Sequence, residues 1–365
     1  MNTDWTKKLK GRKVLVTGHT GFKGSWMLEV LSYLGAEACG YALPAPTKPS
    51  LYELLGHADK QGLKSCIGDI RDGDKLARFM RETEPEIVIH MAAQPIVRTS
   101  YEDPVGTFET NVMGTVKLLE AVRGCGSVRS VVNVTTDKVY LNEEKEEGYR
   151  EDEKLCGYDP YSNSKSCSEL VTYSYLHSFF DKREIAVSTM RAGNVIGGGD
   201  YAKDRLIPDC VRAVEAGTPI VLRNPDSVRP YQHVLEPVCA YLRLAVLQAE
   251  APELAGNYNV GPRLEDCLRT EDMAKLFCEE WKRLAAADPA RSKACVECRP
   301  DGGPHEAKLL RLDCSRIRER LGWEPEWDSR TALKKTVEWA YALSSGRNAE
   351  EITLDQIREY LETEK

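Results

Sequence analysis

The chain has 365 residues, 42% of them hydrophobic and 29% charged, with a formal net charge of −7 at pH 7. These values are typical of one large α/β unit or two closely joined ones, and they leave no excess of basic residues to attract nucleic acid or anionic lipid. The longest apolar runs are much shorter than the roughly 20 residues of a membrane helix, and the polar N-terminus lacks the apolar stretch of a signal peptide. We therefore expect a cytoplasmic protein without nucleic-acid or membrane partners.

Strand-like and helix-like segments alternate through the first half of the chain. The expected strands are short, nearly continuous apolar segments at 13–17, 36–43, 63–70, 86–93, 129–136 and 185–197. Helical patterns fall between them, most clearly at 25–34 and 160–180. Buried apolar strands separated by helices predict a parallel sheet covered on both faces. The expected fold class is therefore α/β, with a doubly wound Rossmann domain.

The second half of the chain has shorter segments, interrupted by loops rich in glycine, proline and charge. We expect a Rossmann domain over residues 1–190, with 230–257 packing back on it. A smaller mixed α/β domain, built from 191–229 and 258–365, is expected to bind the substrate, because such loops usually form a binding surface on a scaffold. The acidic stretch 142–154 is interpreted as a solvated loop.

A glycine-rich segment, TGHTGFKG, follows the first strand and opens the first helix. Gly18 allows a tight turn, Gly21 lets the backbone approach a pyrophosphate, and Gly24 permits close helix packing. The helix N-terminus would then face the anionic ligand, as in dinucleotide sites. The expected cofactor contacts are Gly18, Thr20, Gly21, Phe22, Lys23, Gly24, Asp69, Ile70, Ala92 and Ala93, together with Tyr161 and Lys165.

The second signal of a dinucleotide site is missing. An acidic residue that binds the ribose hydroxyls is expected at the end of the second strand, yet residues 41–44 read YALP. No arginine stands there to bind a 2′-phosphate, so NAD is favoured over NADP, with loosened binding. Asp69 is expected to contact the adenine, and its alternative interpretation is an ordinary cap of the following helix.

Two pairs of residues carry the predicted chemistry. Tyr161 and Lys165 form a YxxxK motif, in which a lysine one turn away and a positively charged nicotinamide ring would stabilise the tyrosinate as a base. Asp137 and Lys138 end the fifth strand, and an acid with an amine indicates elimination added to oxidation, because a plain dehydrogenase has no use for them. The alternatives are exposed helix residues for the first pair and a surface ion pair for the second.

The chain resembles the extended short-chain dehydrogenase/reductase family and, within it, the nucleotide-sugar 4,6-dehydratases. The resemblance covers nearly the whole chain and rests on the motifs HTGFKGSW, HMAAQPIVRTSYEDP, TNVMGT, TTDKVY, GYDPYSNSK, RAGNVIGGGD, DRLIPD and RPYQHVLEP. It implies NAD as the cofactor and a nucleoside diphosphate hexose as the substrate. Relatives that use dTDP-glucose carry Asp-Glu where this chain has Asp137 and Lys138, so the lysine favours CDP-glucose.

The same resemblance implies a role for each catalytic residue. Thr136 would hydrogen-bond the sugar 4-hydroxyl, and Tyr161, supported by Lys165, would deprotonate it as hydride leaves C4. Lys138 in its neutral form would remove the C5 proton, and protonated Asp137 would donate to the departing C6 hydroxyl. An apposed acid and amine can hold these complementary protonation states in a dry pocket. The product would be a 4-keto-6-deoxy sugar for deoxysugar and surface polysaccharide synthesis.

A nucleoside diphosphate brings two negative charges into an acidic protein, so arginines are expected around it. The expected substrate-binding residues are Gln94, Arg98, Asn194, Arg205, Arg229, His233 and His305. Structural salt bridging is the alternative interpretation of Arg205 and Arg229. Tyr201 and Tyr231 stand where relatives usually carry tryptophan. These two departures leave the preference for base and sugar open.

The twelve cysteines are scattered, and their close pair is Cys295 and Cys298. A lone CxxC, even with His305 nearby, does not complete a tetrahedral zinc site, so we expect reduced thiols and no metal. His90, inside the apolar EIVIHMAA, is expected to be a packed strand residue.

Three alternatives to this activity stay open. A nucleotide-sugar 4-epimerase shares the fold, NAD and the Tyr/Lys pair, but would typically carry small neutral residues at 137 and 138. A 4,6-dehydratase for another nucleoside diphosphate hexose is the second. A non-enzymatic NAD-binding sensor is the third, and it should have lost at least one of the four catalytic residues. By resemblance, the helix at 160–180 predicts a homodimer through a four-helix interface, or a homotetramer.

Overall fold

The computed structural model describes residues 5–181, 185–288, 293–299 and 307–363. The strands are β1 (Lys13–Thr17), β2 (Glu37–Ala42), β3 (Lys64–Ile67), β4 (Ile87–His90), β5 (Ser130–Val134), β6 (Ala186–Ala192), β7 (Val195–Ile196), β8 (Ile220–Leu222), β9 (Val228–Arg229), β10 (Gln232–His233), β11 (Asn257–Val260), β12 (Leu268–Arg269) and β13 (Val296–Cys298). The α-helices are α1 (Trp5–Lys8), α2 (Phe22–Tyr33), α3 (Leu51–Leu54), α4 (Gly73–Thr83), α5 (Val97–Glu102), α6 (Pro104–Phe108), α7 (Gly114–Arg123), α8 (Pro160–Tyr175), α9 (Leu206–Glu215), α10 (Leu235–Glu250), α11 (Thr270–Leu284), α12 (Ser315–Leu321), α13 (Ser329–Ser344) and α14 (Ala349–Thr363). Short 3₁₀ segments are η2 (Asp137–Val139), η5 (Pro252–Leu254) and η6 (Leu264–Asp266), and π-helical turns are η1 (Glu109–Met113) and η3 (Leu176–Phe180).

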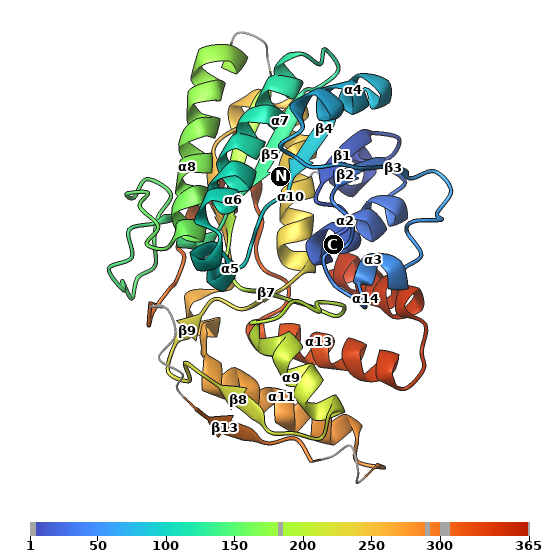
Figure 1. Ribbon diagram of the computed structural model, residues 1–365, viewed down its shortest axis with the longest axis vertical. Coiled ribbons are helices and arrows are strands. Elements are labelled where there is room, and N and C mark those ends of the chain that lie inside the picture. Colours follow the sequence, from blue (N-terminus) through green and yellow to red (C-terminus); the bar gives the residue numbers. More distant parts are fainter. Residues whose placement is uncertain (1–4, 182–184, 289–292, 300–306, 364–365) are drawn as a thin grey trace.

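The upper lobe in Figure 1 is built on a parallel sheet with helices on both faces. Its seven strands lie in the order β11-β6-β5-β4-β1-β2-β3, and each neighbouring pair is parallel. The predicted α/β doubly wound class is therefore confirmed. The strand order reverses between β1 and β4, and ligands of such sheets bind in the crevice beyond the carboxyl ends of strands at this point.

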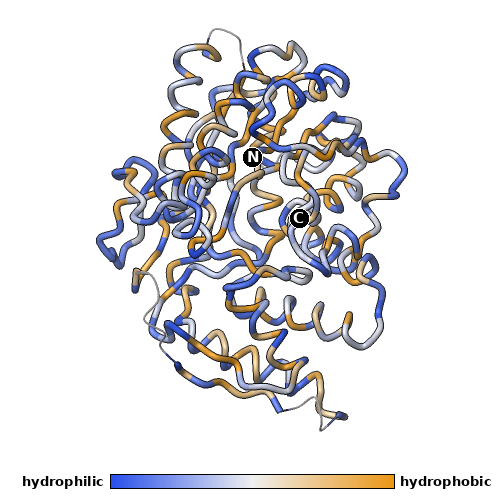
Figure 2. The backbone as a smooth tube through the Cα atoms, viewed as in Figure 1, coloured by the Kyte–Doolittle hydropathy of each residue, from blue (hydrophilic) through white to orange (hydrophobic). Residues whose placement is uncertain are grey.

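Alternating side chains of the strands pack into two separate cores. In β1, Val14 and Val16 face the layer that holds Trp26 of α2, while Leu15 faces the layer that holds Leu118 of α7. This alternation follows from the two-residue period of a strand, and burial on both faces explains why the strands read as continuous apolar runs. Figure 2 shows these apolar strands inside the upper lobe.

The lower lobe in Figure 1 contains β8, β13, α9, α11 and α13. Ile220 of β8, Trp281 of α11 and Leu333 of α13 belong to a third buried cluster. Segments from beyond residue 230 also join the upper lobe, because α10 packs against β4 and β5, β11 forms an edge of the main sheet, and α14 contacts α2. The domain limits stay a prediction. Within the described ranges, no helix is both long and apolar enough to cross a membrane.

The charged stretch 142–154 is a loop in which most charged side chains are exposed, as expected, and it is also held by a distant part of the chain. Tyr149 forms a parallel bridge with Leu312, and its ring stacks on Tyr140 at 5.1 Å between centroids. Asn142 Nδ2 donates to the carbonyl oxygen of Leu309 at 3.2 Å. Leu309 and Leu312 lie more than 150 residues further along the chain than Asn142 and Tyr149, so local charge could not reveal these contacts.

Candidate active site

A cleft of about 1070 Å³ lies where loops of both lobes meet. From the upper lobe it is lined by Lys23, residues 95–98, residues 135–138, Tyr161 and residues 192–197. From the lower lobe it is lined by residues 204–209, residues 220–224, Arg229, Tyr231 and residues 307, 308 and 310. The cleft therefore gathers residues that are distant in sequence, including Asp137, Lys138 and Tyr161 of the predicted catalytic pairs.

The first turn of α8 places Tyr161 in the cleft. Asp159 caps this helix, since its side chain accepts a hydrogen bond from the amide of Ser162 at 2.9 Å, and Pro160 occupies the first turn, where its missing N–H costs nothing. One turn further on, Lys165 is buried and its Nζ donates to the carbonyl oxygen of Val134 at 3.1 Å. The hydrogen bond joins α8 to the end of β5, so the two catalytic segments are held together.

The local environment moves both pKa values of this pair. Burial raises the pKa of Tyr161 to about 12, and a hydrogen bond with Thr136 partly opposes the rise. Burial lowers the pKa of Lys165 to about 8, and the carboxylate of Glu169 opposes that fall. Tyr161 is therefore a neutral phenol in the free chain, and it needs additional positive charge in the cleft before it can act as a base.

The acid and the amine form an ion pair at the start of η2. Lys138 Nζ lies 3.0 Å from Asp137 Oδ1, and Asn194 Oδ1 is 3.5 Å from the same amine. Thr136 caps η2 and donates from its hydroxyl to Asp137 Oδ1 at 3.0 Å. The side chain of Asp137 is fully buried, while that of Lys138 is 30% exposed. The alternative of a surface ion pair does not fit this burial.

The second carboxyl oxygen of Asp137, Oδ2, lies beside Gly193. Asp137 Oδ2 is buried and has no hydrogen-bond partner among the residues that the structure describes. A Cβ at Gly193 would lie 3.3 Å from this oxygen and 2.5 Å from Pro230, so glycine keeps the space beside the carboxyl group open. An unsatisfied buried oxygen is costly, and in a cleft it marks a place where a ligand group is expected to bind.

The glycine-rich loop has the shape of a dinucleotide cradle. Gly18 has a φ of +76°, and a Cβ there would lie 2.9 Å from the amide nitrogen of Ala92. A Cβ at Gly24 would lie 2.3 Å from the carbonyl oxygen of Gly18, so close packing of α2 on the loop requires glycine. Thr20 Oγ1 fixes the loop by donating to the carbonyl oxygen of Leu43 at 2.8 Å. These residues fit a pyrophosphate at the N-terminus of α2.

The side expected to hold the adenosine differs from the usual arrangement. Tyr41 turns into the sheet and its hydroxyl donates to the carbonyl oxygen of Asp69 at 3.0 Å, so the second strand ends without a carboxylate. The carboxylate of Asp69 pairs with Arg71 at 2.7 Å. The helix-cap interpretation of Asp69 is wrong, because Asp72 caps α4. The side chain of Ile70 is buried against Gly114, since a Cβ added at Gly114 would lie only 2.7 Å from it. Ile70 therefore has a packing role.

The predicted substrate-binding residues do not all line the cleft. Arg98, Asn194, Arg205 and Arg229 line the cleft, whereas His305 lies outside the described residues. Arg205 pairs with Asp200 at 3.1 Å, and Arg229 donates to the carbonyl oxygen of Ala307 at 2.7 Å. The salt-bridge interpretation thus fits Arg205, while Arg229 donates hydrogen bonds to backbone oxygens. Both residues still border the cleft.

Gln94 and His233, which are also predicted to bind the substrate, do not line the cleft. The Gln94 side chain is used within its own loop, where its Oε1 accepts from the amide of Ile96 at 2.6 Å. His233 is fully buried, with its ring 5.6 Å from that of Trp26 and 4.9 Å from that of Trp327. Its polarity suggested a ligand contact, and its position between two indoles gives it a packing role.

His90 is buried in β4, as expected for a packed strand residue. Its Nδ1 lies 2.7 Å from the hydroxyl of Thr17. Of the two tyrosines that replace tryptophan, Tyr231 lines the cleft and its hydroxyl lies 3.2 Å from that of Thr270. Tyr201 is outside the lining, and burial raises its pKa to about 12. The substitution at 231 is therefore the one placed to affect ligand binding.

Several cleft residues escaped prediction from the sequence. They are Arg223, Asn224, Asp204, Thr270 and Lys308. Arg223 pairs with Asp204 at 2.6 Å, and both come from loops of the lower lobe. The clustering of charge in RLIPD and RNPD was the available signal, but only the fold brings these loops to the cleft.

All twelve cysteines are free thiols, including the exposed Cys295 and Cys298 beside or within β13. In the part of the chain that is described, no three histidine, cysteine or carboxylate side chains gather closely enough to bind a metal ion. His305, the third residue considered with this pair, is outside that part.

Comparison with known proteins matches this geometry to a family. The profile of the family described as GDP-mannose 4,6 dehydratase matches residues 15–336. The chain belongs to this family. The predicted membership among nucleotide-sugar epimerases and dehydratases is therefore confirmed.

Individual relatives of this dehydratase family member agree with the assignment. The chain is 46% identical to CDP-glucose 4,6-dehydratase of Salmonella typhimurium, over 96% of this chain and 97% of the relative. It is 29% identical to dTDP-glucose 4,6-dehydratase of Xanthomonas campestris pv. campestris, over 89% of this chain and 92% of the relative.

Solved structures share the fold. UDP-glucose 4-epimerase of Thermus thermophilus in complex with NAD is 26% identical, with a TM-score of 0.74 over 90% of this chain and 99% of that one. dTDP-glucose 4,6-dehydratase of Bacillus anthracis in complex with NAD has a TM-score of 0.73, at 22% identity, over 93% of this chain and 100% of that one. The second likeness shows the fold alone.

Proposed function

We propose that this protein is an NAD-dependent CDP-glucose 4,6-dehydratase. The observation that carries the proposal is the ion pair of Lys138 with the fully buried Asp137, in one cleft with Tyr161. Lys165 is buried on the same helix as Tyr161. The 46% identity to a CDP-glucose 4,6-dehydratase over nearly the whole chain supports the proposal. An epimerase needs the tyrosine and lysine but has no elimination step for the acid and the amine.

The cofactor would lie along the glycine-rich loop, with its pyrophosphate at the N-terminus of α2. The loop residues Gly18, Thr20, Gly21, Phe22, Lys23 and Gly24 would hold it, with Asp69, Ile70, Ala92 and Ala93 on the adjoining strand ends. When bound, NAD takes a hydride from C4 of the sugar and returns it to C6. Its positive ring also supplies the charge that the Tyr161 phenol lacks in the free chain.

Oxidation would begin at Tyr161. Thr136 orients the sugar 4-hydroxyl, and Tyr161 accepts its proton as the C4 hydride departs. Lys165 stabilises the tyrosinate through its nearby ammonium and keeps α8 against β5 through its bond to Val134. The resulting 4-ketone makes the C5 proton acidic enough for a side-chain base to remove.

Elimination would use the ion-paired residues. The amine of Lys138, 30% exposed at the cleft, takes the C5 proton after it has passed its own proton to Asp137. Asp137 then donates that proton to the departing C6 hydroxyl, which leaves as water. The buried and unpartnered Oδ2 of Asp137 supports this role, because it is the acid oxygen still able to meet a substrate group.

The diphosphate and nucleoside would extend toward the lower lobe. Arg98, Arg205 and Arg229 supply positive charge along that part of the cleft, and Asn194 lies beside Lys138. We propose that these four residues bind the nucleotide sugar, and that Tyr231 contributes to the preference for CDP.

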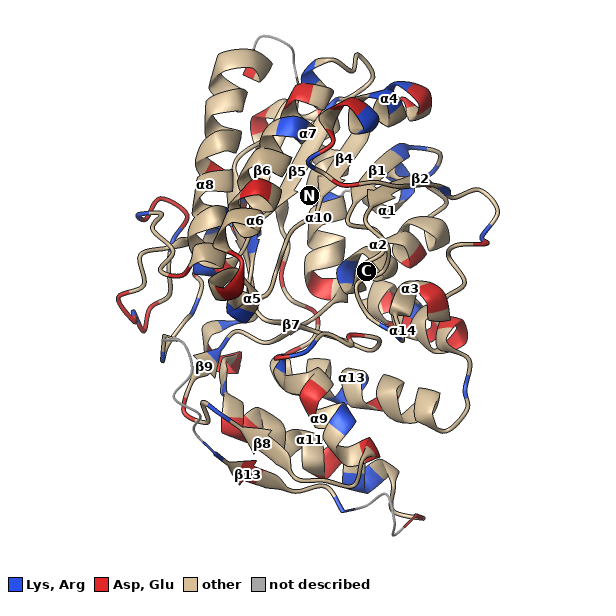
Figure 3. Ribbon diagram, in the orientation of Figure 1, with Lys and Arg blue, Asp and Glu red and all other residues tan. Residues whose placement is uncertain are grey.

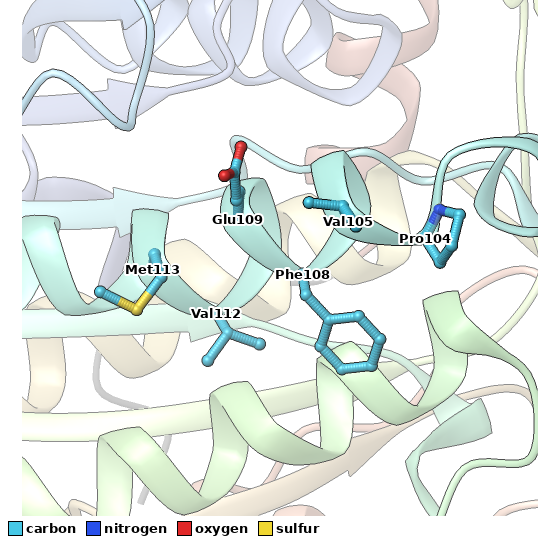
Figure 4. A pocket seen from close by; sticks show the side chains of 6 residues that line it. All are labelled: Pro104, Val105, Phe108, Glu109, Val112 and Met113. Atoms are coloured by element: carbon cyan, nitrogen blue, oxygen red, sulfur yellow. The ribbon is translucent and has the colours of Figure 1, made fainter.

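We propose a homodimer through the outer faces of α6, η1 and α8. Figure 4 shows Phe108 of α6 and Val112 of η1 on one side of these two continuous segments, which also carry Val105 and Met113. Val105 is 68% exposed, and on α8 Tyr173 is 63% exposed. Figure 3 shows α8 almost free of charge, and the two charged residues in its sequence are both buried. An exposed apolar surface of this kind is typical of a protein interface.

We place the reaction in the cytoplasm, since twelve free thiols suit a reducing compartment. The product would feed deoxysugar synthesis for surface polysaccharide.

Incubation of the purified protein with CDP-glucose and NAD tests the proposed function. We expect a CDP-linked 4-keto-6-deoxy sugar, identified by mass loss of one water, and no net reduced cofactor. Conversion to CDP-galactose would instead indicate an epimerase. Turnover of dTDP- or UDP-glucose in preference to CDP-glucose would contradict the substrate assignment.

A further inference from the structure

A lysine amine lies inside the cleft at the position where the glycine-rich loop becomes α2. Lys23 is in the first turn of this helix and lines the same cleft as Tyr161 and Asp137. Its Nζ is 5.8 Å from the centroid of the Tyr241 ring, which α10 contributes. The Lys23 amine therefore lies in the catalytic cleft and is separate from the Tyr161–Lys165 pair.

Charged and titratable groups surround this amine from every packed element. Lys165 on α8 and Arg205 before α9 add positive charge, while Asp137 at η2 adds negative charge. Tyr161 on α8 and Tyr241 on α10 contribute neutral hydroxyls, and burial raises the pKa of Tyr241 far above its ordinary value. Across the described ranges, no carboxylate forms an ion pair with Lys23.

This environment makes the charge of Lys23 sensitive near neutral pH. Burial lowers its pKa to about 7, the positive charges of Lys165 and Arg205 add to the fall, and Asp137 opposes it. The amine is therefore a cation in mildly acid solution and neutral in mildly alkaline solution.

We propose that the ammonium of Lys23 sets the preference of this site for the reduced over the oxidised cofactor. The inference rests on the proposed function, because the sugar held at Tyr161 can pass its C4 hydride to NAD only if the nicotinamide lies in this part of the cleft. The oxidised ring carries a positive charge and the reduced ring carries none. A cation in the cleft repels the oxidised ring and leaves the reduced ring unaffected.

The arrangement has a chemical use in a cycle that borrows a hydride and returns it. Destabilising the oxidised ring favours uptake of hydride from C4, and it raises the share of enzyme that carries the reduced cofactor with the 4-ketone, on which elimination depends. The same repulsion weakens the binding of oxidised NAD in the free enzyme. The missing carboxylate at residues 41–44 removes a ribose contact from both forms and cannot produce a difference between them.

A competing role for Lys23 is direct binding of the cofactor pyrophosphate, since it belongs to the phosphate loop. The two roles make opposite predictions. The pyrophosphate is identical in both redox forms, so loss of a phosphate contact weakens both equally. Loss of a repelling charge tightens the oxidised form alone.

Dissociation constants of NAD and NADH, measured by titration without sugar, test the inference on the full-length protein and two variants. Lys23→Met removes the charge and keeps the length of the side chain, and Lys23→Arg makes the charge permanent. We expect Lys23→Met to bind NAD about tenfold more tightly at about pH 6, with NADH changed less than about threefold. Lys23→Arg should keep weak binding of NAD at every pH.

The pH dependence supplies a second readout. In the unmodified protein the ratio of the NAD to the NADH dissociation constant should fall by about tenfold between about pH 6 and about pH 8.5, as Lys23 loses its proton. Lys165, whose pKa is lowered to about 8, titrates in the same range. Lys23→Met retains Lys165, so the slope that remains in this variant belongs to Lys165, and the difference belongs to Lys23.

Equal weakening of both redox forms in Lys23→Met, at an unchanged melting temperature, would overturn the inference in favour of a phosphate contact. Unchanged binding of both forms would overturn it as well. Neither result affects the proposed function, which would fail if the unmodified protein bound neither NAD nor NADH.

Discussion

Lys138 Nζ lies 3.0 Å from Asp137 Oδ1, while Asp137 Oδ2 is buried and has no partner among the described residues. One oxygen of the carboxyl group is thus paired with the amine, and the other is left without a partner among the described residues. This is the geometry that a coupled acid and base require, because the proton that Lys138 gives up is the one that Asp137 needs. Asp137 Oδ2 lies beside Gly193, where an added Cβ would be 3.3 Å from it.

Replacing Lys138 by methionine should separate oxidation from elimination. Tyr161 and Lys165 remain in place, so C4 oxidation should proceed, while removal of the C5 proton loses its base. We expect turnover of CDP-glucose to fall by about 100-fold or more, the usual scale of a lost general base. Reduced nicotinamide should accumulate on the enzyme, which is measurable by its absorbance within one turnover.

Lys334→Met is the matched control, because Lys334 is an exposed lysine of α13 paired with Glu338. It should leave both steps unchanged. If Lys138→Met slowed formation of the reduced cofactor as much as product release, Lys138 would not act in elimination alone.

The Tyr161–Lys165 pair predicts a particular pH profile. Burial raises the pKa of Tyr161 to about 12, and only its deprotonated form is a base, so the rate of C4 oxidation should rise with pH on the acid side. Removing the ammonium in Lys165→Met should shift this limb to higher pH and slow oxidation by about 10- to 100-fold at neutral pH. Single-turnover formation of reduced nicotinamide across pH provides the measurement.

Tyr161→Phe serves as the companion variant and should abolish oxidation at every pH. A Lys165→Met profile that superimposes on that of the unmodified protein would show that Lys165 only anchors α8 to β5.

The sequence could predict those parts of the protein that depend on local pattern. Six of the seven strands of the sheet, the turn at Gly18 and the start of α8 each carry a short-range signal, and the structure has elements at all of these places. The seventh strand, β11, was not predicted. The buried position of His90 also followed from its apolar neighbours.

Other parts depend on contacts between distant segments and could not be predicted. His233 and Gln94 have side chains suited to ligands. The ring of His233, however, packs between Trp26 and Trp327. The side chain of Gln94 accepts a hydrogen bond from the amide of Ile96 in its own loop. The cleft contribution of Arg223 arises only when the lower lobe folds beneath β6 and β7.

The proposed dimer surface predicts that charge on α8 will produce monomers. Leu170 is 56% exposed on this helix, and Leu170→Glu should place a charge in the apolar interface. We expect sedimentation equilibrium to change from a dimer to a monomer of 40.9 kDa.

Tyr33→Glu provides the control for this substitution. Tyr33 is 45% exposed at the end of α2, in the opposite helical layer, so the dimer should persist. A Leu170→Glu protein that sediments as the unmodified one does would contradict the proposed interface.

A buried carboxyl group outside the cleft predicts a pH-dependent stability. Glu236 accepts hydrogen bonds from the amide of Trp327 at 2.8 Å and from the hydroxyl of Tyr360 at 2.7 Å, which joins α10 to the C-terminal segments. Burial nevertheless raises its pKa to about 8. Between the ordinary carboxyl pKa and this value the folded state holds a proton that the unfolded state has lost, so the contribution to stability falls as pH rises.

Glu236→Gln should remove this dependence. In the unmodified protein, the free energy of unfolding in urea should fall between about pH 5 and about pH 8. In Glu236→Gln we expect this fall to be smaller by about 1 to 3 kcal/mol. The exposed Glu324 offers the control, and Glu324→Gln should retain the full dependence. Parallel curves for the unmodified protein and Glu236→Gln would show that Glu236 is ionised in the folded state.

The central claim is that one active site oxidises C4, eliminates water and returns the same hydride to C6. It is tested most directly by incubating the protein with NAD and CDP-glucose that carries deuterium at C4, in ordinary water, with a parallel sample of unlabelled sugar in deuterated water. The account predicts that the C4 deuterium appears at C6 of a 4-keto-6-deoxy product, and that solvent deuterium appears at C5. Return of the deuterium to C4 with inverted configuration, and no exchange at C5, would contradict it.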